Sequence, residues 1–469
     1  MEHREYESGG AFYAMAIITS LILAWLSLLA GVFFEGLRSG SASDVHIRQT
    51  ALIFLALTLF FLEFTGAYRV GRRRLFEVLY AVFISAVLIN LVMLLLPFFD
   101  IQYFRSAWTI IIITATQIVL FGIWTYVFHR LYFAFFPRKK AIVVADSLDN
   151  AEYCAWKVRK HSREYEVAAT MEFSQWEEEQ PDCDTVIAYK LTPSRQETLT
   201  RRRFEEKLEL CVIPDLWELG LYCSRQAQFG DFLVLHLSSS SLSVGQRVVK
   251  RFIDIIGAAA GLIVSCAPIL VMAAVVLLQD GKNPFFTQER LTRGGRVFKL
   301  VKLRSMIPDA ESLTGPVLAS YSDNRVTPFG RWMRKMRLDE LPQFWNVLVG
   351  DMSLVGPRPE RPHFFELYSK DIPEFSYRLS VKAGITGMAH VYGRYDTQPE
   401  ERIKLDLHYM MHYSLRMDIK LLIETARIML SPSYAEGKRD EPGASGSGAA
   451  HKAAETGETG NPPAGDGTE

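Results

Sequence analysis

The chain has 469 residues, which suits two to four domains at about 100 to 200 residues per domain. Its 52 Lys and Arg residues equal its 52 Asp and Glu residues, so the formal net charge is zero. This balance excludes a uniformly basic nucleic-acid-binding protein and a polyacidic disordered chain. Residues 431–469 carry seven acids against three basic residues, so the rest of the chain is mildly basic. We expect this tail, which is rich in Gly, Ser and Pro, to be disordered.

Four apolar segments near the N-terminus predict membrane-spanning helices. They are residues 9–34, 50–68, 78–99 and 106–128. Glu63 is the one charge among them, and each segment approaches or exceeds the roughly 20 residues that cross a hydrocarbon layer. Arg and Lys concentrate after the second and fourth segments, so we expect both ends of the bundle in the cytoplasm. The pattern predicts a four-helix transmembrane domain over residues 1–134.

Residues 135–245 are expected to form a small α/β domain. Helical segments separate short β-branched strands, expected at residues 141–145, 167–171 and 184–189. The turn at residues 146–150 contains no glycine that would let the backbone approach a diphosphate, so dinucleotide binding is disfavoured. We interpret this domain as a degenerate Rossmann-like fold with a structural or regulatory role.

A fifth apolar segment, residues 255–279, is also long enough to cross a membrane. Lys250 and Arg251 precede it and further basic residues follow it, a pattern expected when both ends stay in the cytoplasm. Pro268 lies near the midpoint, where a helix loses a hydrogen bond and bends. We therefore favour a re-entrant helix that breaks at Pro268 and returns to the same face. The alternative is a plain fifth span, which would place the rest of the chain outside the cell.

The segment after this helix is rich in Arg, Gly, Pro and acidic residues. Lys302 and Arg304 alternate with apolar residues, which places both cations on one face of a strand. There they could bind a phosphate or form a solvated edge. Residues 329–337 predict an amphipathic helix whose cationic side includes Arg331, as is typical of helices at an anionic membrane surface.

Asp339 and Glu340 precede Pro342, a residue tolerated in the first turn of a helix. Asp339 is therefore expected to be the N-cap of a helix that ends at Gly350. The free N–H groups and the dipole of a helix N-terminus favour an anion, which would lower the pKa of the Asp339 carboxyl. The alternative is a capping Asp beside a solvated Glu, with no chemical role.

Two prolines stiffen the turn at residues 356–359, and its rigidly presented Arg358 suits bidentate contact with a diphosphate. Further glycines and cations follow, among them Gly384, Gly387 and Arg394. Together these residues predict a site for an anionic, phosphorylated substrate beside a membrane.

Six sequence blocks occur in a fixed order. They are Lys-Arg-x-x-Asp at 250–254, Lys-x-Arg-Ser-Met at 302–306, Asp-x-Arg-Val-Thr-x-x-Gly-Arg at 323–331, Leu-Asp-Glu-Leu-Pro-Gln at 338–343, a block ending in Gly-Pro-Arg-Pro at 346–359, and Gly-Ile-Thr-Gly at 384–387. In these blocks the chain resembles the large form of the bacterial sugar transferase family, the polyprenyl-phosphate glycosyl-1-phosphate transferases. The stretch from 323 to 359 is too long a match for chance. The chain departs from the family at Met388-Ala389-His390, where Trp-Gln is common, and at Ala383, where Pro is common.

The resemblance implies a membrane α+β fold. It joins the four-helix transmembrane bundle and the small α/β domain to a re-entrant helix with a mostly helical cytoplasmic phosphoglycosyl transferase domain, over residues 246–430. It also implies a multi-pass protein of the bacterial inner membrane, and it leaves a homodimer open.

The same resemblance implies a reaction. Asp339 would attack the sugar-bearing phosphorus of a UDP-sugar bound with Mg²⁺, release UMP, and pass the phosphosugar to a polyprenyl phosphate of the inner leaflet. Glu340 would bind the metal, with water activation as its less favoured role. The basic residues expected to contact the diphosphate or the carrier phosphate are Lys302, Arg304, Arg331, Arg358 and Arg394. The product would start a repeat unit of exopolysaccharide, capsule or O-antigen.

Two other functions stay open at this point. One is a non-catalytic membrane scaffold or regulator of polysaccharide export, in which Asp339 only caps a helix. The other is a membrane-anchored nucleotide-sugar dehydratase, which the missing glycine-rich turn disfavours. Release of UMP would separate the transferase from the scaffold.

Overall fold

The computed structural model describes residues 2–39, 44–70, 75–95, 107–179, 181, 183–206, 208–222, 224–229, 231–236, 242–308, 325–393 and 397–430. The chain divides into two compact units, Met1–Ile213 and Pro214–Glu469, and each is described by itself. The tail that we predict to be disordered, residues 431–469, lies outside the described residues.

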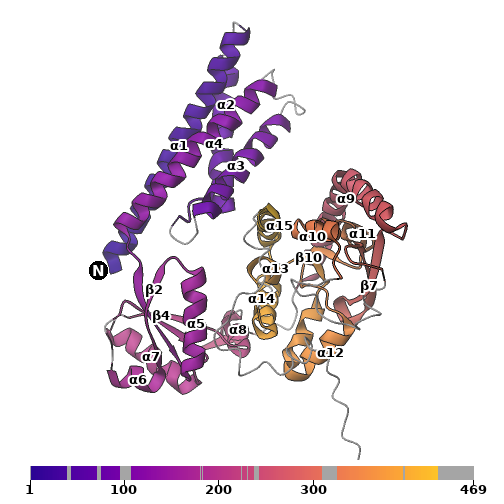
Figure 1. Cartoon of the computed structure of the whole chain (residues 1–469). Helices are drawn as coiled ribbons and strands as arrows, with labels where there is room; N and C mark the ends of the chain where they lie inside the picture. Colours follow the sequence, from indigo (N-terminus) through magenta and orange to yellow (C-terminus); the bar gives the residue numbers. More distant parts are fainter. Residues whose placement is uncertain are drawn as a thin grey trace, which may run out of the picture. The chain divides into compact units, whose positions relative to one another are not determined.

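The first unit begins with four helices (Figure 1). They are α1 (Glu2–Ser39), α2 (Asp44–Thr65), α3 (Leu75–Leu95) and α4 (Ala107–Phe135). α1 and α3 each pack against both α2 and α4. Leu28, Phe54 and Ile113 are buried at the centre, whereas Phe33 and Leu52 are exposed on the outside. Helices that are apolar on all sides suit a lipid environment.

Three helices of this bundle are long and apolar enough to cross a membrane: Phe12–Glu35, Leu75–Leu95 and Trp108–Phe135. The apolar part of α2, Ala51–Thr65, is shorter than a full span. Together with the strands that follow, these helices make the chain a membrane α+β protein.

A four-stranded parallel sheet completes the first unit. In spatial order its strands are β2 (Tyr165–Glu172), β1 (Lys139–Ala145), β3 (Thr185–Tyr189) and β4 (Glu209–Ile213). Its helices are α5 (Leu148–His161), α6 (Phe173–Glu179) and α7 (Pro193–Glu206). Ala141 and Val143 of β1 pack towards α5, while Ile142 and Val144 pack towards α6 and α7 on the other face (Figure 1). This is a doubly wound α/β arrangement, in agreement with the predicted strands.

The second unit opens with α8 (Leu216–Tyr222) and an antiparallel hairpin of β5 (Arg225–Phe229) and β6 (Phe232–His236). The long helix α9 (Val244–Asp280) leads to a second hairpin, β7 (Phe285–Leu291) and β8 (Val297–Leu303), joined by the turn η2 (Arg293–Gly295). The helices that follow are α10 (Pro328–Lys335), η3 (Leu338–Glu340), α11 (Gln343–Val349), α12 (Pro362–Asp371), η4 (Pro373–Ser380), α13 (Met388–Tyr392), α14 (Pro399–Met411) and α15 (Leu415–Leu430). Among them β9 (Ser353–Val355) and β10 (Gly384–Thr386) pair in parallel.

The core of the second unit surrounds β9. Met352 precedes this strand, and Phe364, Phe375 and Tyr409 reach it from α12, η4 and α14; all four side chains are at most 2% exposed. Burial of large aromatic side chains stabilises the unit most, at roughly 1.5–3 kcal/mol for each fully buried side chain. This packing fixes the loop after β9, which carries Arg358 of the candidate site.

Helix α9 is continuous through Pro268. It begins with a capping box between Ser243 and Gln246 and ends at Gly281, which has the left-handed conformation (φ 70°). The helix is thus not interrupted at Pro268, because neighbouring turns can hold a long helix together around a proline that removes one backbone hydrogen bond. The predicted bend and return to the same face stay a prediction. Helix α9 is the fourth helix of the described residues that is long and apolar enough to cross a membrane.

Both arms of α9 pack against the same unit. In the arm before Pro268, Gly257 lies against Leu354 and Gly261 against Phe344, so closely that a Cβ on either glycine would approach the neighbouring side chain to less than 3 Å. In the arm after Pro268, side chains including Met272 share a buried cluster with residues of β8 and α10. Both ends of the helix are thus attached to one folded body.

Candidate active site

Asp339 and Glu340 lie in the 3-10 turn η3, which precedes α11. The backbone here makes tight i to i+3 hydrogen bonds, such as Leu341 N–H to Leu338 O at 3.3 Å. The N-cap of α11 is Pro342 and its C-cap is Gly350. The prediction of Asp339 as the N-cap is therefore wrong, because the 3-10 turn moves the start of the α-helix, whereas the predicted end at Gly350 is confirmed.

Three cations surround the Glu340 carboxylate. Lys302 Nζ on β8 donates to Glu340 Oε1 at 3.0 Å, and Arg358 Nη2 lies 3.7 Å from the same oxygen. Arg337 Nη1 lies 3.7 Å from Oε2. Burial would raise the pKa of Glu340, but these cations outweigh burial and hold its pKa far below the usual range. Glu340 is therefore ionised.

Asp339 is 7% exposed. Burial and the negative charge of Glu340 raise the pKa of its carboxyl, and this outweighs the opposite effect of Lys302 and Arg334. The predicted lowering of this pKa is thus wrong, because burial next to a second acid dominates. Two adjacent carboxyls whose pKa values are pushed apart are a frequent feature of catalytic sites.

The two cations predicted on one strand face separate in the structure. Lys302 is in β8 and reaches Glu340, whereas Arg304 lies beyond Leu303, where the strand ends. The Arg304 guanidinium forms two hydrogen bonds with Asp280 at the end of α9, at 2.5 and 2.6 Å. Arg304 therefore links α9 to the strand end and is bound away from the Asp339 pair.

Arg331 is exposed on α10, and no contact joins it to Asp339. The α10 cation that acts on Asp339 is Arg334, whose Nε donates to Ser305 Oγ at 2.8 Å. The amphipathic pattern of residues 329–337 did not distinguish these two arginines. Arg394 lies outside the described residues.

His390 is a site residue that the sequence analysis did not select. Its Nε2 accepts a hydrogen bond from Arg358 Nη1, and its buried Nδ1 has no hydrogen-bond partner among the described residues. Burial and the charges of Arg358 and Arg337 hold the pKa of His390 well below its usual range, so the ring is neutral. Its 50-residue separation from Glu340 in the sequence left no local signal for this contact.

Several of these side chains, though not that of Asp339, line one pocket that is open to solvent. Its lining includes Lys302, Glu340, Arg358 and His390, together with Gln343 at the start of α11. The cations face an ionised acid whose charge they exceed, so the pocket attracts an anion such as a diphosphate.

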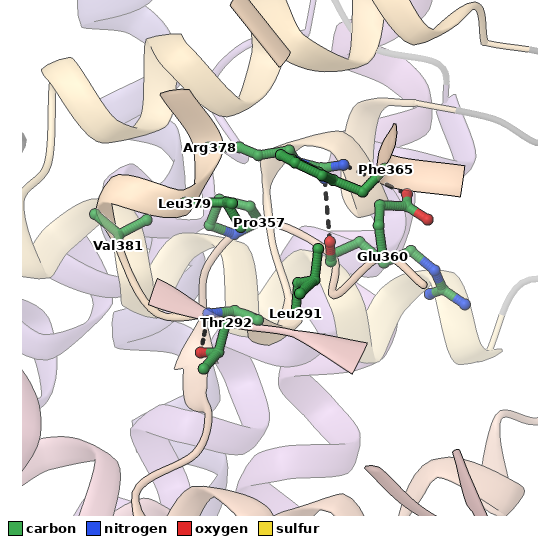
Figure 2. Close-up of a pocket in the computed structure, with 10 residues that line it drawn as sticks. Leu291, Thr292, Pro357, Glu360, Phe365, Arg378, Leu379 and Val381 are labelled. Carbon is green, nitrogen blue, oxygen red and sulfur yellow. Dashed lines mark hydrogen bonds and ion pairs between the residues drawn. The ribbon is translucent and has the colours of Figure 1, made fainter. Parts of the chain in front are cut away.

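The loop that carries Arg358 is held from behind by a buried arginine. Arg378, 4% exposed, donates to the backbone oxygen of Arg358 at 3.1 Å and to Asp406 at 2.8 Å. Glu360 lies 3.4 Å from the same guanidinium. Figure 2 shows Arg378 and Glu360 beside Pro357 in a second pocket. This network fixes the backbone of the loop and hence the direction of Arg358.

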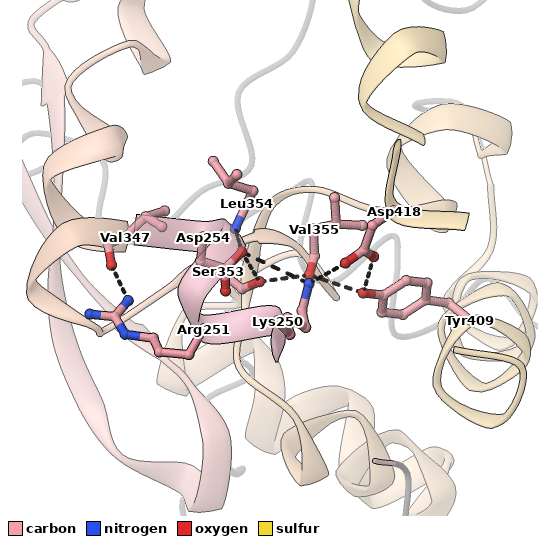
Figure 3. Close-up of polar contacts among 9 residues, drawn as sticks. All are labelled: Lys250, Arg251, Asp254, Val347, Ser353, Leu354, Val355, Tyr409 and Asp418. Carbon is pink, nitrogen blue, oxygen red and sulfur yellow. Dashed lines mark hydrogen bonds and ion pairs between the residues drawn. The ribbon is translucent and has the colours of Figure 1, made fainter. Parts of the chain in front are cut away.

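The Lys-Arg-x-x-Asp block anchors the first arm of α9 (Figure 3). Lys250 Nζ donates to Asp418 of α15 at 2.7 Å, and Asp254 accepts from Ser353 Oγ and from Leu354 N–H, both at 3.0 Å. All of these groups are buried or nearly so. Buried, fully partnered charges stabilise one arrangement over others, so this block fixes α9 against β9 and α15.

The acids closest to the pocket are Asp339 and Glu340, and Glu340 is the one that lines it. Within the described residues no group of three or more His, Cys, Asp or Glu side chains could hold a metal ion. Mg²⁺ is commonly bound through one or two carboxylates and the phosphate oxygens of its substrate, so this pair is compatible with a substrate-borne ion.

Residues 245–432 match the model of a family described as bacterial sugar transferase. The chain is 33% identical over 269 residues to a UDP-galactose-lipid carrier transferase of Erwinia amylovora. The match covers 53% of this chain and 56% of that protein. It is 30% identical over 267 residues to an undecaprenyl-phosphate galactose phosphotransferase of Salmonella typhimurium, covering 53% and 55%. It is 45% identical over 152 residues to a Bacillus subtilis protein provisionally named undecaprenyl-phosphate N-acetylgalactosaminyl 1-phosphate transferase. This match covers 32% of this chain and 84% of that protein. The chain spans about half the length of the first two relatives.

Proposed function

The chain belongs to the bacterial sugar transferase family, and we propose on that ground that it transfers a sugar 1-phosphate from a UDP-sugar to undecaprenyl phosphate. The observation that carries the proposal is the buried Asp339–Glu340 pair with Lys302 and Arg358 beside it, inside the segment that matches the family. A site that combines a buried carboxyl with cations around a pocket suits phosphoryl transfer, in which positioning and charge stabilisation dominate.

In the first step a carboxylate oxygen of Asp339 attacks the sugar-bearing phosphorus of the UDP-sugar. The bond between this phosphorus and the bridging oxygen breaks, and UMP leaves with that oxygen. The phosphosugar is then bound to Asp339 as an acyl phosphate. Lys302 and Arg358 would stabilise the charge that collects on the phosphoryl oxygens and on the leaving UMP.

In the second step an oxygen of undecaprenyl phosphate attacks the same phosphorus. The acyl phosphate bond breaks, Asp339 is released as a carboxylate, and the lipid becomes an undecaprenyl diphosphate sugar. Attack requires Asp339 to be ionised in the first step. Because burial raises its pKa, Lys302 and Arg334 are the groups that favour the reactive form.

Glu340 is the residue that would hold Mg²⁺ in this proposal. When bound, the ion would neutralise part of the diphosphate charge. Glu340 already pairs with Lys302 and Arg358, so in the substrate complex these two cations would exchange the carboxylate for phosphoryl oxygens.

We further propose that α9 is re-entrant, with a bend at Pro268, and that the second unit lies on the cytoplasmic face of the inner membrane. The support is the attachment of both ends of α9 to one folded body: Lys250 bonds Asp418 and Asp280 bonds Arg304. A straight transmembrane helix would separate these ends by the roughly 30 Å thickness of the hydrocarbon layer.

Cysteine labelling tests this topology. With the native cysteines replaced by serine, Gly245→Cys and Lys282→Cys place single thiols just inside the start and just beyond the end of α9. Re-entry predicts that a membrane-impermeant maleimide leaves both unlabelled in spheroplasts and labels both after permeabilisation. Labelling of only one position in intact spheroplasts would indicate a crossing helix.

The reaction itself is tested by UMP release from the purified full chain with a panel of UDP-sugars, with and without Mg²⁺ and undecaprenyl phosphate. The proposal predicts UMP release and a labelled undecaprenyl diphosphate sugar for at least one substrate. The relatives' names include galactose and N-acetylgalactosamine, so both sugars belong in the panel. No UMP release with any sugar, in protein that retains its fold, would favour a scaffold or regulator of polysaccharide export. An active transferase would start a repeat unit of a surface polysaccharide.

A further inference from the structure

A second group of cations lies near the end of α11. Arg251 Nη2 and Lys382 Nζ lie 3.2 and 3.6 Å from the point where a Cβ would stand on Gly350. Arg293 and Arg296, on the turn before β8, add to the positive charge at Lys382. None of these four residues lines the pocket beside Glu340.

The members of this cluster differ in how well they are paired. Arg251 donates to the backbone oxygens of Val347 and Leu348 at 2.6 and 2.8 Å, so the C-terminal end of α11 holds its guanidinium in place (Figure 3 shows the contact with Val347). Arg296 pairs with Asp351 at 2.8 Å. Two carbonyl oxygens and the partly buried carboxylate of Asp351 leave the cluster with an excess of positive charge.

Lys382 is the unpaired member. It is half-buried, yet its Nζ makes no hydrogen bond or ion pair with any residue that the structure describes. Burial and the charge of Arg251 lower its pKa, while Asp254, the acid whose charge acts in the opposite direction, already accepts hydrogen bonds from Ser353 and Leu354. A half-buried ammonium facing other cations is costly unless an anion shares the site.

Exposed apolar residues lie close to the cluster in the sequence. Phe252 and Val349, which adjoin Arg251 and Gly350 in the sequence, are 65% and 59% exposed, and Trp345 is 56% exposed. Ile255 and Ile256 continue the exposed apolar surface into the arm of α9 proposed to enter the membrane. A soluble anion makes no favourable contact with apolar side chains, whereas the acyl chains joined to a lipid phosphate can pack against them.

We propose that Lys382 and Arg251, aided by Arg293 and Arg296, form a binding site for the headgroup phosphate of an anionic phospholipid of the inner leaflet. Basic groups just outside a membrane segment on its cytoplasmic side attract anionic lipids. The bound lipid would supply the missing counter-charge of Lys382 and place its acyl chains along Phe252 and α9. The inference rests on the proposed placement of α9 and not on the transferase reaction.

Native mass spectrometry of the full chain in detergent, titrated with phosphatidylglycerol or phosphatidylcholine, tests this site. We expect Lys382→Gln to weaken phosphatidylglycerol binding about tenfold, the effect of one charge-assisted contact, and to leave phosphatidylcholine binding unchanged. Lys299→Gln, which removes an exposed cation of β8, is the matched control and should change neither.

Thermal unfolding separates lipid binding from a purely structural role. Without anionic lipid, Lys382→Gln should not lower the melting temperature, because the substitution removes repulsion between cations. Phosphatidylglycerol should raise the melting temperature of the wild type and of Lys299→Gln, but not of Lys382→Gln. Equal phosphatidylglycerol binding by Lys382→Gln and Lys299→Gln would overturn the proposal, as would full displacement of the lipid by millimolar inorganic phosphate. UMP release is measured separately, so a failed transferase proposal leaves this test intact.

Discussion

Lys302 Nζ donates to Glu340 Oε1 at 3.0 Å, and this contact joins the end of β8 to the turn that carries Asp339. The same ammonium lowers the pKa of both acids, although only Glu340 ends below its usual range. Asp339 stays above its usual range because it is buried and adjoins an ionised neighbour. One lysine thus affects both the position of the acidic pair and the ionisation of the proposed nucleophile.

The first prediction concerns Lys302. Lys302→Met should reduce UMP release by about 100-fold, since the site loses a cation at the phosphoryl group. It should also raise the pKa of Asp339 further, because a charge that favours the carboxylate is gone. On acidification, the variant should then lose activity at a higher pH than the wild type does. A pH–rate profile of both proteins measures this difference. Lys299→Met, which removes an exposed cation three residues earlier on the same strand, is the control. An unchanged acid limb in Lys302→Met would show that the lysine does not act on Asp339.

The second prediction concerns the covalent step at Asp339. In the absence of undecaprenyl phosphate, the wild type should release about one UMP per chain and retain the labelled phosphosugar on the protein. Asp339→Asn should abolish both, because an amide is not a nucleophile. The isosteric change also leaves membrane insertion intact, which the yield in the membrane fraction checks. Label retained by Asp339→Asn would assign the nucleophile to another residue.

Apolar length and the motif blocks were sufficient to predict the main parts of the fold. The apolar helices and the β-α-β pattern of the first unit follow from local sequence, since lipid burial and strand alternation act residue by residue. The continuity of α9 through Pro268 could not be predicted, because it depends on tertiary packing: the arm before Pro268 packs against Phe344 and Leu354, more than 80 positions away, and the arm after it packs against β8 and α10.

The candidate site was predicted in part. Lys302, Glu340 and Arg358 do meet beside Asp339, as their charges and blocks suggested. Arg304 does not join them, because β8 ends at Leu303 and the alternation of side chains ends with it. The sign of the Asp339 pKa shift was mispredicted, because burial of a carboxyl depends on tertiary packing and not on its neighbours in the sequence.

The third prediction concerns the buried pair of Arg378 and Asp406. Asp406→Ala leaves the Arg378 guanidinium buried without its main partner, which should cost about 3–5 kcal/mol and lower the melting temperature by roughly 10 °C. Asp406→Asn keeps an acceptor for Arg378 and is the matched control, with a smaller loss. Equal melting temperatures for the two variants would show that the hydrogen bond to Arg378 contributes little.

The same pair predicts a pH effect on stability. Burial raises the pKa of Asp406 from its ordinary value of 3.8 to about 6. The folded state therefore binds a proton at Asp406 more readily than the unfolded state does. Proton binding at Asp406 thus stabilises the folded state at low pH, and this stabilisation is lost as the pH rises through about 6. As the pH rises from 4 to 6, the free energy of unfolding of the wild type should fall relative to that of Asp406→Asn, whose side chain cannot titrate. Parallel melting curves of the two proteins across this range would contradict a raised pKa.

The last prediction concerns His390 as a positioning residue. Its neutral ring accepts a hydrogen bond from Arg358, which faces Glu340 and the proposed diphosphate site. His390→Leu removes this acceptor, so Arg358 should become less ordered and the KM for the UDP-sugar should rise about tenfold, with a smaller change in kcat. His390→Gln offers an amide oxygen to the same guanidinium and should restore KM to within about threefold of the wild type. If the ring only fills space, leucine would replace it as well as glutamine does, and both variants would have the same KM.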